Sequence, residues 1–345
     1  MYKLNFLVED PGSINFILNI EKKLKKNKYR TKIFTNKNGK KYLELHNYFK
    51  SYLFNKRQIK NLTDTDFLIL GTSEKNDSYL DDLVLNMKKK KKLCALIIDS
   101  PTFVKERLFK NINFGLINKV DYFFVSDKNT FEKLKKLKVE KNKILEVLNP
   151  KFEYIQNMQI LPKKNQVLFL TELSEGLIST EFIKNKNYSF SGFSKSKKRT
   201  EIILEEFLMA INKYRKEIKV GIKLHPKEKK KSYEKYIKYV DFLYDSSNSI
   251  KEIFRSKLIV GMSTNLLCEA RLKNIATLSI LPRKKEIQWI NSDIVNYIDI
   301  ALNKNQIQTY LENFFDSKVY TKKIVIKKKT FSECIIKIFE QNFKI

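Results

Sequence analysis

The feature that most constrains the fold is a regular alternation between short apolar runs and longer amphipathic stretches. In the first half the runs are largely continuous in apolar residues rather than alternating, as in LCALII at 93–98. The stretches between them repeat apolar residues at helical spacing. Strand–helix alternation of this kind indicates βαβ units. Because the runs are apolar throughout, we expect parallel strands that are covered on both faces.

The second half repeats this plan from about residue 166, although no sequence repeat is visible. The strands that the pattern predicts are 3–8, 31–35, 66–70, 93–98, 121–125, 166–171, 219–224, 240–244, 257–261 and 275–280. The helices that it predicts are 13–26, 39–50, 79–90, 127–138, 200–216, 231–239, 248–255, 264–273, 304–315 and 330–343. Both halves therefore read as open parallel α/β sheets.

The length of 345 residues suits two domains of about 150 residues each. The segment 151–165 is polar, contains a proline and has no clear period, so we place the linker there. We expect two Rossmann-like doubly wound α/β domains that face each other across a cleft. They would span 1–155 and 156–320, and a basic tail with a helix at 321–345 would return to the N-terminal domain.

The composition is strongly basic, with a formal net charge of +31. Such a charge attracts polyanions, but the basic residues spread along the whole chain in runs such as 88–92 and 227–231. Because a dedicated nucleic-acid binder more often concentrates them on one module, we expect no specific nucleic-acid partner. An AT-rich coding bias toward Lys, Asn and Ile would also raise the charge, and both explanations stay open.

Cysteine usage and hydropathy bear on the compartment. Cys94, Cys268 and Cys334 are far apart and form no metal-type pair, so we expect free thiols and a reducing compartment. No apolar run reaches the ~20 residues of a membrane span, and the N-terminus lacks a signal-peptide pattern. We expect a cytoplasmic protein, and the basic segment KKIVIKKK suggests peripheral attachment to an anionic inner membrane face.

Doubly wound domains bind ligands beyond the carboxyl ends of their strands. Glu9 and Asp10 follow the first predicted strand, and the turn Pro11-Gly12-Ser13 opens the next helix. A carboxylate at this position can act as a general base toward an acceptor hydroxyl. The alternative is that Asp10 or Ser13 only caps the helix.

Three further strand ends carry polar residues. Thr72 and Asp99 follow the third and fourth strands, and Thr171 follows the first strand of the second half. We expect them to line the ligand site, although such residues are also ordinary in turns. The long loop 173–198, with its sequence SFSGFSKSKK, suits either a phosphate or sugar site or a mobile surface loop.

His225 directly follows the run VGIKL, and Pro226 blocks further strand. An imidazole at this point can donate a hydrogen bond to a phosphate oxygen or to a departing phosphate. Lys223 and Lys227 add positive charge beside it. The alternative is a histidine that only satisfies a local turn.

Two later strand ends complete the predicted phosphate site. Ser246 and Ser247 follow the run VDFLY. The sequence VGMSTNLLCEA then opens a helix, and hydroxyls with backbone N–H groups at a helix start form an anion site, although the hydroxyls suit plain capping as well. The residues assigned to this helix start are Gly261, Ser263, Thr264, Asn265 and, for a ribose, Glu269.

Several well-known motifs are missing from the sequence. It has no Walker loop, no G-x-G-x-x-G, no H-E-x-x-H and no G-x-S-x-G. Their absence argues against a P-loop NTPase, a standard dehydrogenase, a zincin and an α/β-hydrolase.

The segments KLHPKE and YDSSNSIKEIFRSKLIVGMSTNLLCEARLKNIATLSI resemble the donor half of GT-B glycosyltransferases, with their His-Pro and Ser/Thr motifs. The likeness is greatest to bacterial sialyltransferases and polysialyltransferases. Capsule and teichoic-acid polymerases and nucleotide-sugar 2-epimerases share the layout. The segment VDYFFVSDKNTFEKLKKLKVEKNKILEVLNP resembles the end of the N-terminal domain in that superfamily.

The resemblance implies a GT-B fold in which His225, Ser263 and Thr264 contact the donor phosphate and Glu9 or Asp10 is the acceptor base. It implies an inverting glycosyltransferase of capsule, lipopolysaccharide or other cell-surface glycan synthesis. Its partners would be a nucleotide-activated sugar, favoured as a CMP-nonulosonic acid or CMP-Kdo type, and a glycan or lipid-linked acceptor. We expect no metal and no cofactor.

Three alternatives stay open: a glycerophosphate or polyol-phosphate transferase, a nucleotide-sugar 2-epimerase, and a non-catalytic basic binder of polyanions. The sequence leaves open the sugar, the nucleotide base, the acceptor and linkage, the oligomeric state, and which of Glu9 and Asp10 is the base.

Overall fold

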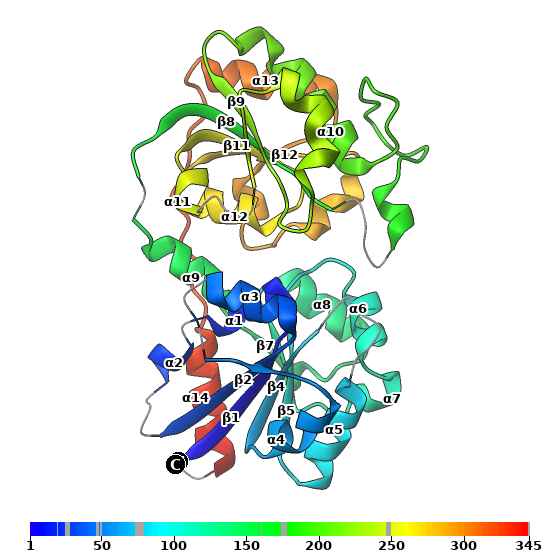
Figure 1. Cartoon of the computed structure of the whole chain (residues 1–345), viewed down its shortest axis with the longest axis vertical. Helices are drawn as coiled ribbons and strands as arrows, with labels where there is room; N and C mark the ends of the chain where they lie inside the picture. Colours follow the sequence, from blue (N-terminus) through cyan, green and yellow to red (C-terminus); the bar gives the residue numbers. More distant parts are fainter. Residues whose placement is uncertain are drawn as a thin grey trace. The chain divides into compact units, whose positions relative to one another are not determined.

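The computed structural model describes the chain apart from residues 19, 25–27, 46, 47, 49, 73–78, 160, 174–177, 246–249, 344 and 345. The chain divides into two compact units (Figure 1). Unit 1 comprises Met1–Tyr154 and Ile326–Ile345, and unit 2 comprises Ile155–Val325.

Unit 1 is built on a parallel sheet, which in the described part of the chain has seven strands in the order β3-β2-β1-β4-β5-β6-β7. The strands are β1 (Tyr2–Leu7), β2 (Tyr29–Thr35), β3 (Tyr52–Leu53), β4 (Phe67–Gly71), β5 (Leu93–Ile98), β6 (Tyr122–Val125) and β7 (Ile144–Glu146). The α-helices are α1 (Pro11–Ile17), α2 (Ile20–Lys23), α3 (Lys37–Leu45), α4 (Ile59–Thr63), α5 (Leu80–Lys89), α6 (Val104–Asn111), α7 (Phe114–Ile117), α8 (Lys128–Lys136) and α14 (Phe331–Phe343). Helix α9 (Pro150–Asn157) begins in unit 1 and ends in unit 2.

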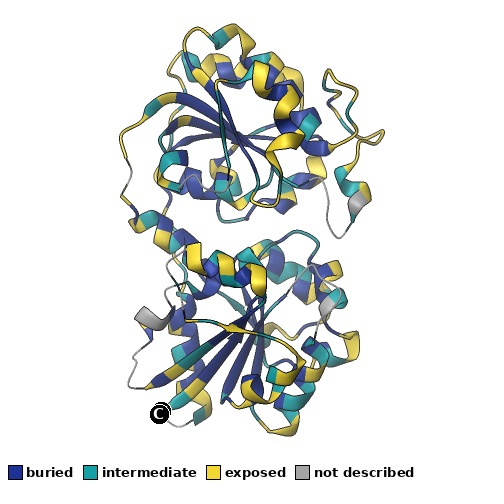
Figure 2. Ribbon diagram, viewed as in Figure 1, coloured by how far each residue is buried: buried dark blue, intermediate teal, exposed yellow. Residues whose placement is uncertain are grey.

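The apolar strands of unit 1 bury both faces of the sheet. Side chains alternate across a strand, so Ile69 and Ile97 join the core on one face while Leu68 and Leu96 join the core on the other. Figure 2 shows this sheet buried and its helices exposed on their outer sides. The sequence pattern of continuously apolar strands is explained by this double coverage.

The C-terminal helix α14 belongs to unit 1, where it lies beside β1 and β2 (Figure 1). Phe331, Ile335 and Phe339 repeat at a spacing of four residues and enter the same core as Leu4 and Phe6. This spacing puts the apolar side chains on one face of the helix.

Unit 2 has a second parallel sheet, with six strands among the described residues in the order β10-β9-β8-β11-β12-β13. The strands are β8 (Lys164–Leu170), β9 (Lys219–Lys223), β10 (Phe242–Tyr244), β11 (Ser256–Gly261), β12 (Ala276–Ile280) and β13 (Asp299–Ala301). The helices are α10 (Arg199–Ile211), α11 (Ile250–Ile253), α12 (Asn265–Leu272), α13 (Lys304–Phe315) and a 3-10 helix, η5 (Lys230–Tyr239).

The prediction of a two-domain α/β fold with parallel sheets is confirmed. Several elements differ from the pattern-based prediction. The segment 151–165 was expected to be an irregular linker, but its start lies in helix α9. Helix α6 was not predicted, and 231–239 forms a 3-10 helix rather than an α-helix. No described helix is long and apolar enough to cross a membrane.

Candidate functional site

The strand order of unit 2 sets the position of its candidate site. Strand β8 lies between β9 and β11, so the chain leaves β8 toward one side of the sheet and later returns on the other. Open α/β sheets bind ligands beyond the carboxyl ends of strands at such a switch point. At this edge Thr171 and Glu172 follow β8, His225 follows β9 and Ser263 follows β11.

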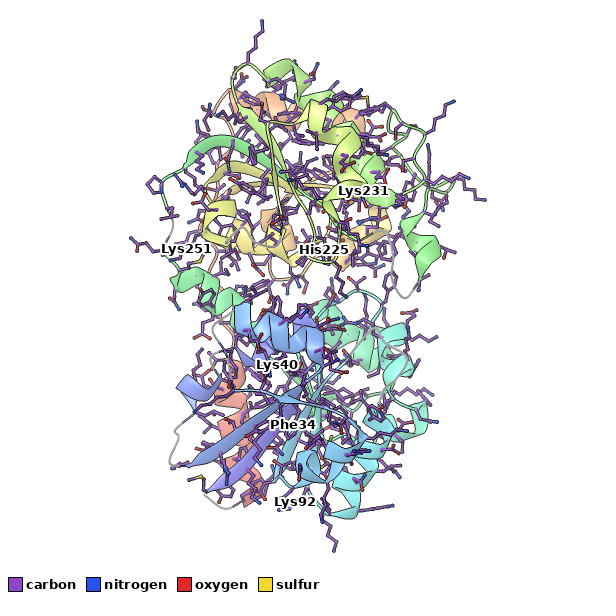
Figure 3. The ribbon with its side chains drawn as sticks, in the orientation of Figure 1. Phe34, Lys40, Lys92, His225, Lys231 and Lys251 are labelled. Carbon is purple, nitrogen blue, oxygen red and sulfur yellow. The ribbon has the colours of Figure 1, made fainter. Side chains whose placement is uncertain are left out.

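The turn after β9 is fixed to the end of β8 through backbone groups. The Thr171 N–H donates to the carbonyl of Lys223 (2.9 Å), and the His225 N–H donates to Thr171 Oγ1 (2.8 Å) and to Glu228 Oε2 (3.1 Å). The Glu228 N–H returns to the His225 carbonyl (2.8 Å). His225 therefore sits in a closed turn, HPKE, at the switch point, and Figure 3 labels it there within unit 2.

The imidazole of His225 is partly buried, and burial lowers its pKa from 6.5 to about 4. The positive charges of Lys227 and Lys223 act in the same direction, while Glu172 opposes them. His225 is therefore neutral at pH 7. Because the Lys227 N–H donates to its Nδ1 (3.2 Å), the hydrogen-bond network assigns the ring proton to Nε2. The side chain thus offers one neutral N–H donor.

Glu172 connects the ends of β8 and β11. Its carboxylate accepts from the Ser263 N–H, from Ser263 Oγ (3.0 Å) and from Arg199 Nη1 (2.9 Å). Thr264 accepts from the Leu266 N–H (3.3 Å) and is the N-cap of α12. Ser263 and Thr264, predicted to bind phosphate, therefore make these hydrogen bonds within the chain.

A buried ionic network extends from this point. Arg199 forms an ion pair with Glu286 (2.5 Å), and both side chains are 0% exposed. Glu286 also pairs with Arg283 (2.6 Å), and Trp289 lies under the guanidinium groups of Arg199 and Arg283. Burial alone would lower the pKa of Arg199, but the carboxylates of Glu286 and Glu172 outweigh this effect and raise it. The network fixes the start of α10, where Arg199 is the first residue.

The loop 173–198, which the sequence suited to either a phosphate or sugar site or a mobile surface loop, binds carboxylates of the chain itself through its segment 191–193. The N–H groups of Ser191 and Gly192 donate to Glu206 Oε1 (3.0 and 2.9 Å), and that of Phe193 donates to Glu205 Oε2 (2.7 Å). Gly192 has a φ of +66°, and a Cβ there would lie 2.3 Å from Glu205 Oε2. The Ser-Gly sequence therefore attaches the loop to α10.

The remaining predicted residues of unit 2 have varied positions. Lys223 is buried and donates to the Leu224 carbonyl (2.7 Å), and its burial lowers its pKa. Pro226 and Lys227 are exposed. Gly261 ends β11, Asn265 opens α12 and Glu269 is buried on that helix, while Ser246 and Ser247 lie outside the described residues.

In unit 1 the predicted acceptor-side residues meet at the carboxyl ends of β1, β4 and β5. A Cβ on Gly12 would lie 1.6 Å from Asp99 Oδ2, and one on Gly71 would lie 2.5 Å from Ser13 Cβ. The hydroxyl of Thr72 donates to the Ile97 carbonyl (3.3 Å).

The three carboxylates at this edge of unit 1 differ in their surroundings. Asp99 forms a buried ion pair with Arg107 (2.5 Å). Asp10 precedes α1 without capping it through its side chain, and Glu9 lies beside it, also partly exposed. The alternative considered above was capping of α1 by Asp10 or Ser13. The Asp10 side chain makes no capping hydrogen bond, and the Ser13 hydroxyl donates to the Asp10 carbonyl (3.0 Å).

Three important residues were not predicted for the site: Glu172, Arg199 and Glu228. Glu228 lies within the HPKE sequence, so the short spacing to His225 was the available signal. Arg199 and Glu286 are far apart in sequence, and nothing in the sequence pairs them. No group of three His, Cys, Asp or Glu residues suited to a metal ion occurs in the part of the chain that the structure describes.

No protein-family model and no curated protein matches the sequence. Solved structures do match. The UDP-GlcNAc 2-epimerase of Methanocaldococcus jannaschii has a TM-score of 0.65 at 14% identity, over 99% of this chain and 100% of that one. The chain has the GT-B-like fold of these epimerases.

Two further matches were solved with ligands. The UDP-GlcNAc 2-epimerase of Neisseria meningitidis, bound to UDP-GlcNAc, has a TM-score of 0.62 at 12% identity and covers 99% of this chain and 100% of that one. HepE of Anabaena, in complex with UDP and glucose, has a TM-score of 0.54 at 9% identity and covers 99% and 96%. At these identities the likeness extends to the fold alone.

Proposed function

We propose that the chain is an enzyme that acts on a nucleotide-activated sugar and binds the phosphates at the switch point of unit 2. The observation that carries the proposal is the neutral His225, held in a closed turn with Nε2–H as its donor. A neutral imidazole donates to a phosphate oxygen without taking up a proton from solution. Its place beyond β8, β9 and β11 is where doubly wound sheets bind ligands.

The first candidate reaction is 2-epimerisation of a UDP-sugar. Epimerases from several organisms share the fold over nearly the whole chain, and one was solved with UDP-GlcNAc and another with UDP-GlcNAc and UDP. This support favours UDP over the CMP donor expected from the sequence. Inversion at C2 breaks and remakes a C–H bond at that carbon, so the reaction leaves an isotopic record.

The second candidate is an inverting glycosyltransferase, which the position of Asp10 favours. Its carboxylate follows β1 at the carboxyl edge of the sheet of unit 1. A carboxylate at such a strand end can act as general base toward the hydroxyl of a glycan or lipid-linked acceptor. A CMP-nonulosonic acid or CMP-Kdo donor belongs to this second candidate.

Incubation with UDP-GlcNAc in D2O separates the two reactions. An epimerase produces the C2 epimer with deuterium at C2 and needs no acceptor, whereas a glycosyltransferase releases the nucleotide only when an acceptor is present. UDP-GlcNAc and a CMP-sugar are tested in parallel, with His225→Ala as the control. If the protein neither binds nor converts any sugar nucleotide, the proposal is wrong.

We also propose that the basic segment 318–329 attaches the protein to an anionic membrane surface. It holds six lysines and no acidic residue. Tyr320 and Val325, between these lysines, are 86% and 64% exposed. Exposed aromatic and apolar side chains among lysines suit the headgroup region of a bilayer, where a lipid-linked acceptor would lie.

A further inference from the structure

Glu228 is the most highly connected side chain of the His225 turn. Its Oε1 accepts from the Tyr233 hydroxyl (2.6 Å). Its Oε2 accepts from the His225 N–H (3.1 Å) and from the Thr171 hydroxyl. One carboxylate thus joins the end of β8, the end of β9 and the 3-10 helix η5.

The donors around this carboxylate are mostly buried. Thr171 is buried, and Tyr233 is 3% exposed. Burial, followed by the negative charge of Glu228, raises the pKa of the Tyr233 hydroxyl, which therefore remains a donor at pH 7. Hydrogen bonds from several donors to one charged acceptor are stronger than those between neutral groups and give the turn a defined geometry.

The orientation of the imidazole depends on this turn. The Lys227 N–H reaches Nδ1 of His225 because residues 225–228 form a tight turn, which the Glu228 N–H closes onto the His225 carbonyl (2.8 Å). If the turn opened, Nδ1 would lose its donor and could carry the proton itself. The imidazole would then also gain contact with water.

We propose that Glu228 is a positioning residue for His225: its carboxylate closes the HPKE turn and so presents Nε2–H as the donor to a ligand phosphate. The contact with a ligand phosphate rests on the proposed function, whereas the positioning of His225 by Glu228 does not. Glu228 is not itself a phosphate ligand, because its negative charge would repel one. The ring that it orients makes the contact.

The test uses nuclear magnetic resonance of the imidazole. The chain has two histidines, so His46→Gln leaves His225 as the only imidazole signal. In this background the nitrogen and carbon shifts should show a single Nε2–H tautomer with a pKa of about 4. In Glu228→Gln we expect a mixture of tautomers and a pKa raised toward 6.5, because burial is the main cause of the low value.

Two further variants keep the test decisive. Glu234→Gln removes the same charge from an exposed position of η5 and should leave the tautomer and the pKa of His225 unchanged. Tyr233→Phe removes only one of the donors to Glu228 and should change the tautomer and the pKa of His225 less than Glu228→Gln does. Tyr233→Phe also provides the test if Glu228→Gln fails to fold. A single Nε2–H tautomer and an unchanged pKa in both Glu228→Gln and Tyr233→Phe would overturn the proposal.

Titration with UDP distinguishes this proposal from the proposed function. If both hold, His225→Ala and Glu228→Gln each weaken UDP binding by about tenfold or more, consistent with the loss of about 1.5–3 kcal/mol for a hydrogen bond to a charged group. A changed tautomer in Glu228→Gln with UDP binding equal to that of the wild type refutes the phosphate contact and retains the positioning. If the tautomer is unchanged in Glu228→Gln while His225→Ala binds UDP more weakly, the positioning by Glu228 is refuted and the phosphate contact of His225 is retained.

Discussion

The backbone N–H of Lys227 lies 3.2 Å from Nδ1 of His225 and donates to it. The ring therefore carries its proton on Nε2 when it is neutral, and its burial keeps it neutral at physiological pH. Without Lys227 as donor, either nitrogen could hold the proton. A backbone group two residues away thus decides which nitrogen of the neutral imidazole carries the proton.

The low pKa of His225 predicts a specific dependence of stability on pH. Below pH 6.5 the unfolded chain binds a proton at this histidine, whereas the folded chain binds it only near pH 4. The free energy of unfolding therefore falls as the pH decreases from 6.5 to 4. The shift corresponds to a contribution of about 2–3 kcal/mol between pH 7.5 and pH 4.5.

Urea unfolding of the wild type and of His225→Gln at both pH values measures this contribution. We expect the wild type to lose about 2–3 kcal/mol more than the variant on acidification. Equal losses in the two proteins would mean that His225 titrates normally in the folded state.

Arg199 should be among the residues most important for the stability of unit 2. Replacing it with methionine leaves the partly buried Glu172 carboxylate without its guanidinium partner and leaves Glu286 with Arg283 alone. Removing one partner of a buried ion pair costs about 3–5 kcal/mol. Lys213→Met, which breaks an exposed ion pair with Glu312, is the control and should leave urea unfolding nearly unchanged.

Gly12 should be intolerant of any side chain. A Cβ there would overlap the Asp99 carboxylate, which would have to turn away from Arg107. We expect Gly12→Ala to destabilise unit 1 by about 3 kcal/mol or more. Gly115→Ala is the matched control, because its Cβ would meet only Asn113 Oδ1 at an ordinary 3.5 Å. Similar melting temperatures for the two variants would contradict this account.

The fold could be predicted from the sequence because its signal is local. Runs such as LCALII are apolar throughout, and only a parallel sheet covered on both faces buries every one of their side chains. Helix α9 was missed because it begins at Pro150 and has only a weak apolar face. Helix α6 was missed because its sequence, VKERLFKN, is dominated by polar residues.

The site could be predicted only in part. His225 was identified because the adjacent Pro226 marks the end of its strand, so the signal is local in the sequence. The contacts of Ser263 could not be predicted, because Glu172 and Arg199 come from 91 and 64 residues away along the chain. Hydrogen bonds between strand ends depend on strand order, which no local pattern contains.

The basic segment predicts binding to anionic vesicles. Each lysine near an anionic surface contributes about 1 kcal/mol, so replacing Lys322, Lys323 and Lys327 with glutamate should weaken partitioning by about 100-fold or more. The control changes the exposed residues Lys229, Lys230 and Lys231 in the same way and keeps the net charge equal. Cosedimentation with phosphatidylserine vesicles measures both. Equal loss in the two triple variants would assign the binding to overall charge.

The central claim is that a nucleotide sugar binds unit 2 through the phosphate contact of His225, and calorimetric titration of UDP into the protein at pH 7.5 tests it most directly. We predict saturable binding by the wild type, and binding about 10- to 100-fold weaker in His225→Ala, from the loss of about 1.5–3 kcal/mol for a hydrogen bond to a charged group. Binding of equal strength in the two proteins, or no binding of UDP or CMP by the wild type, would contradict the account.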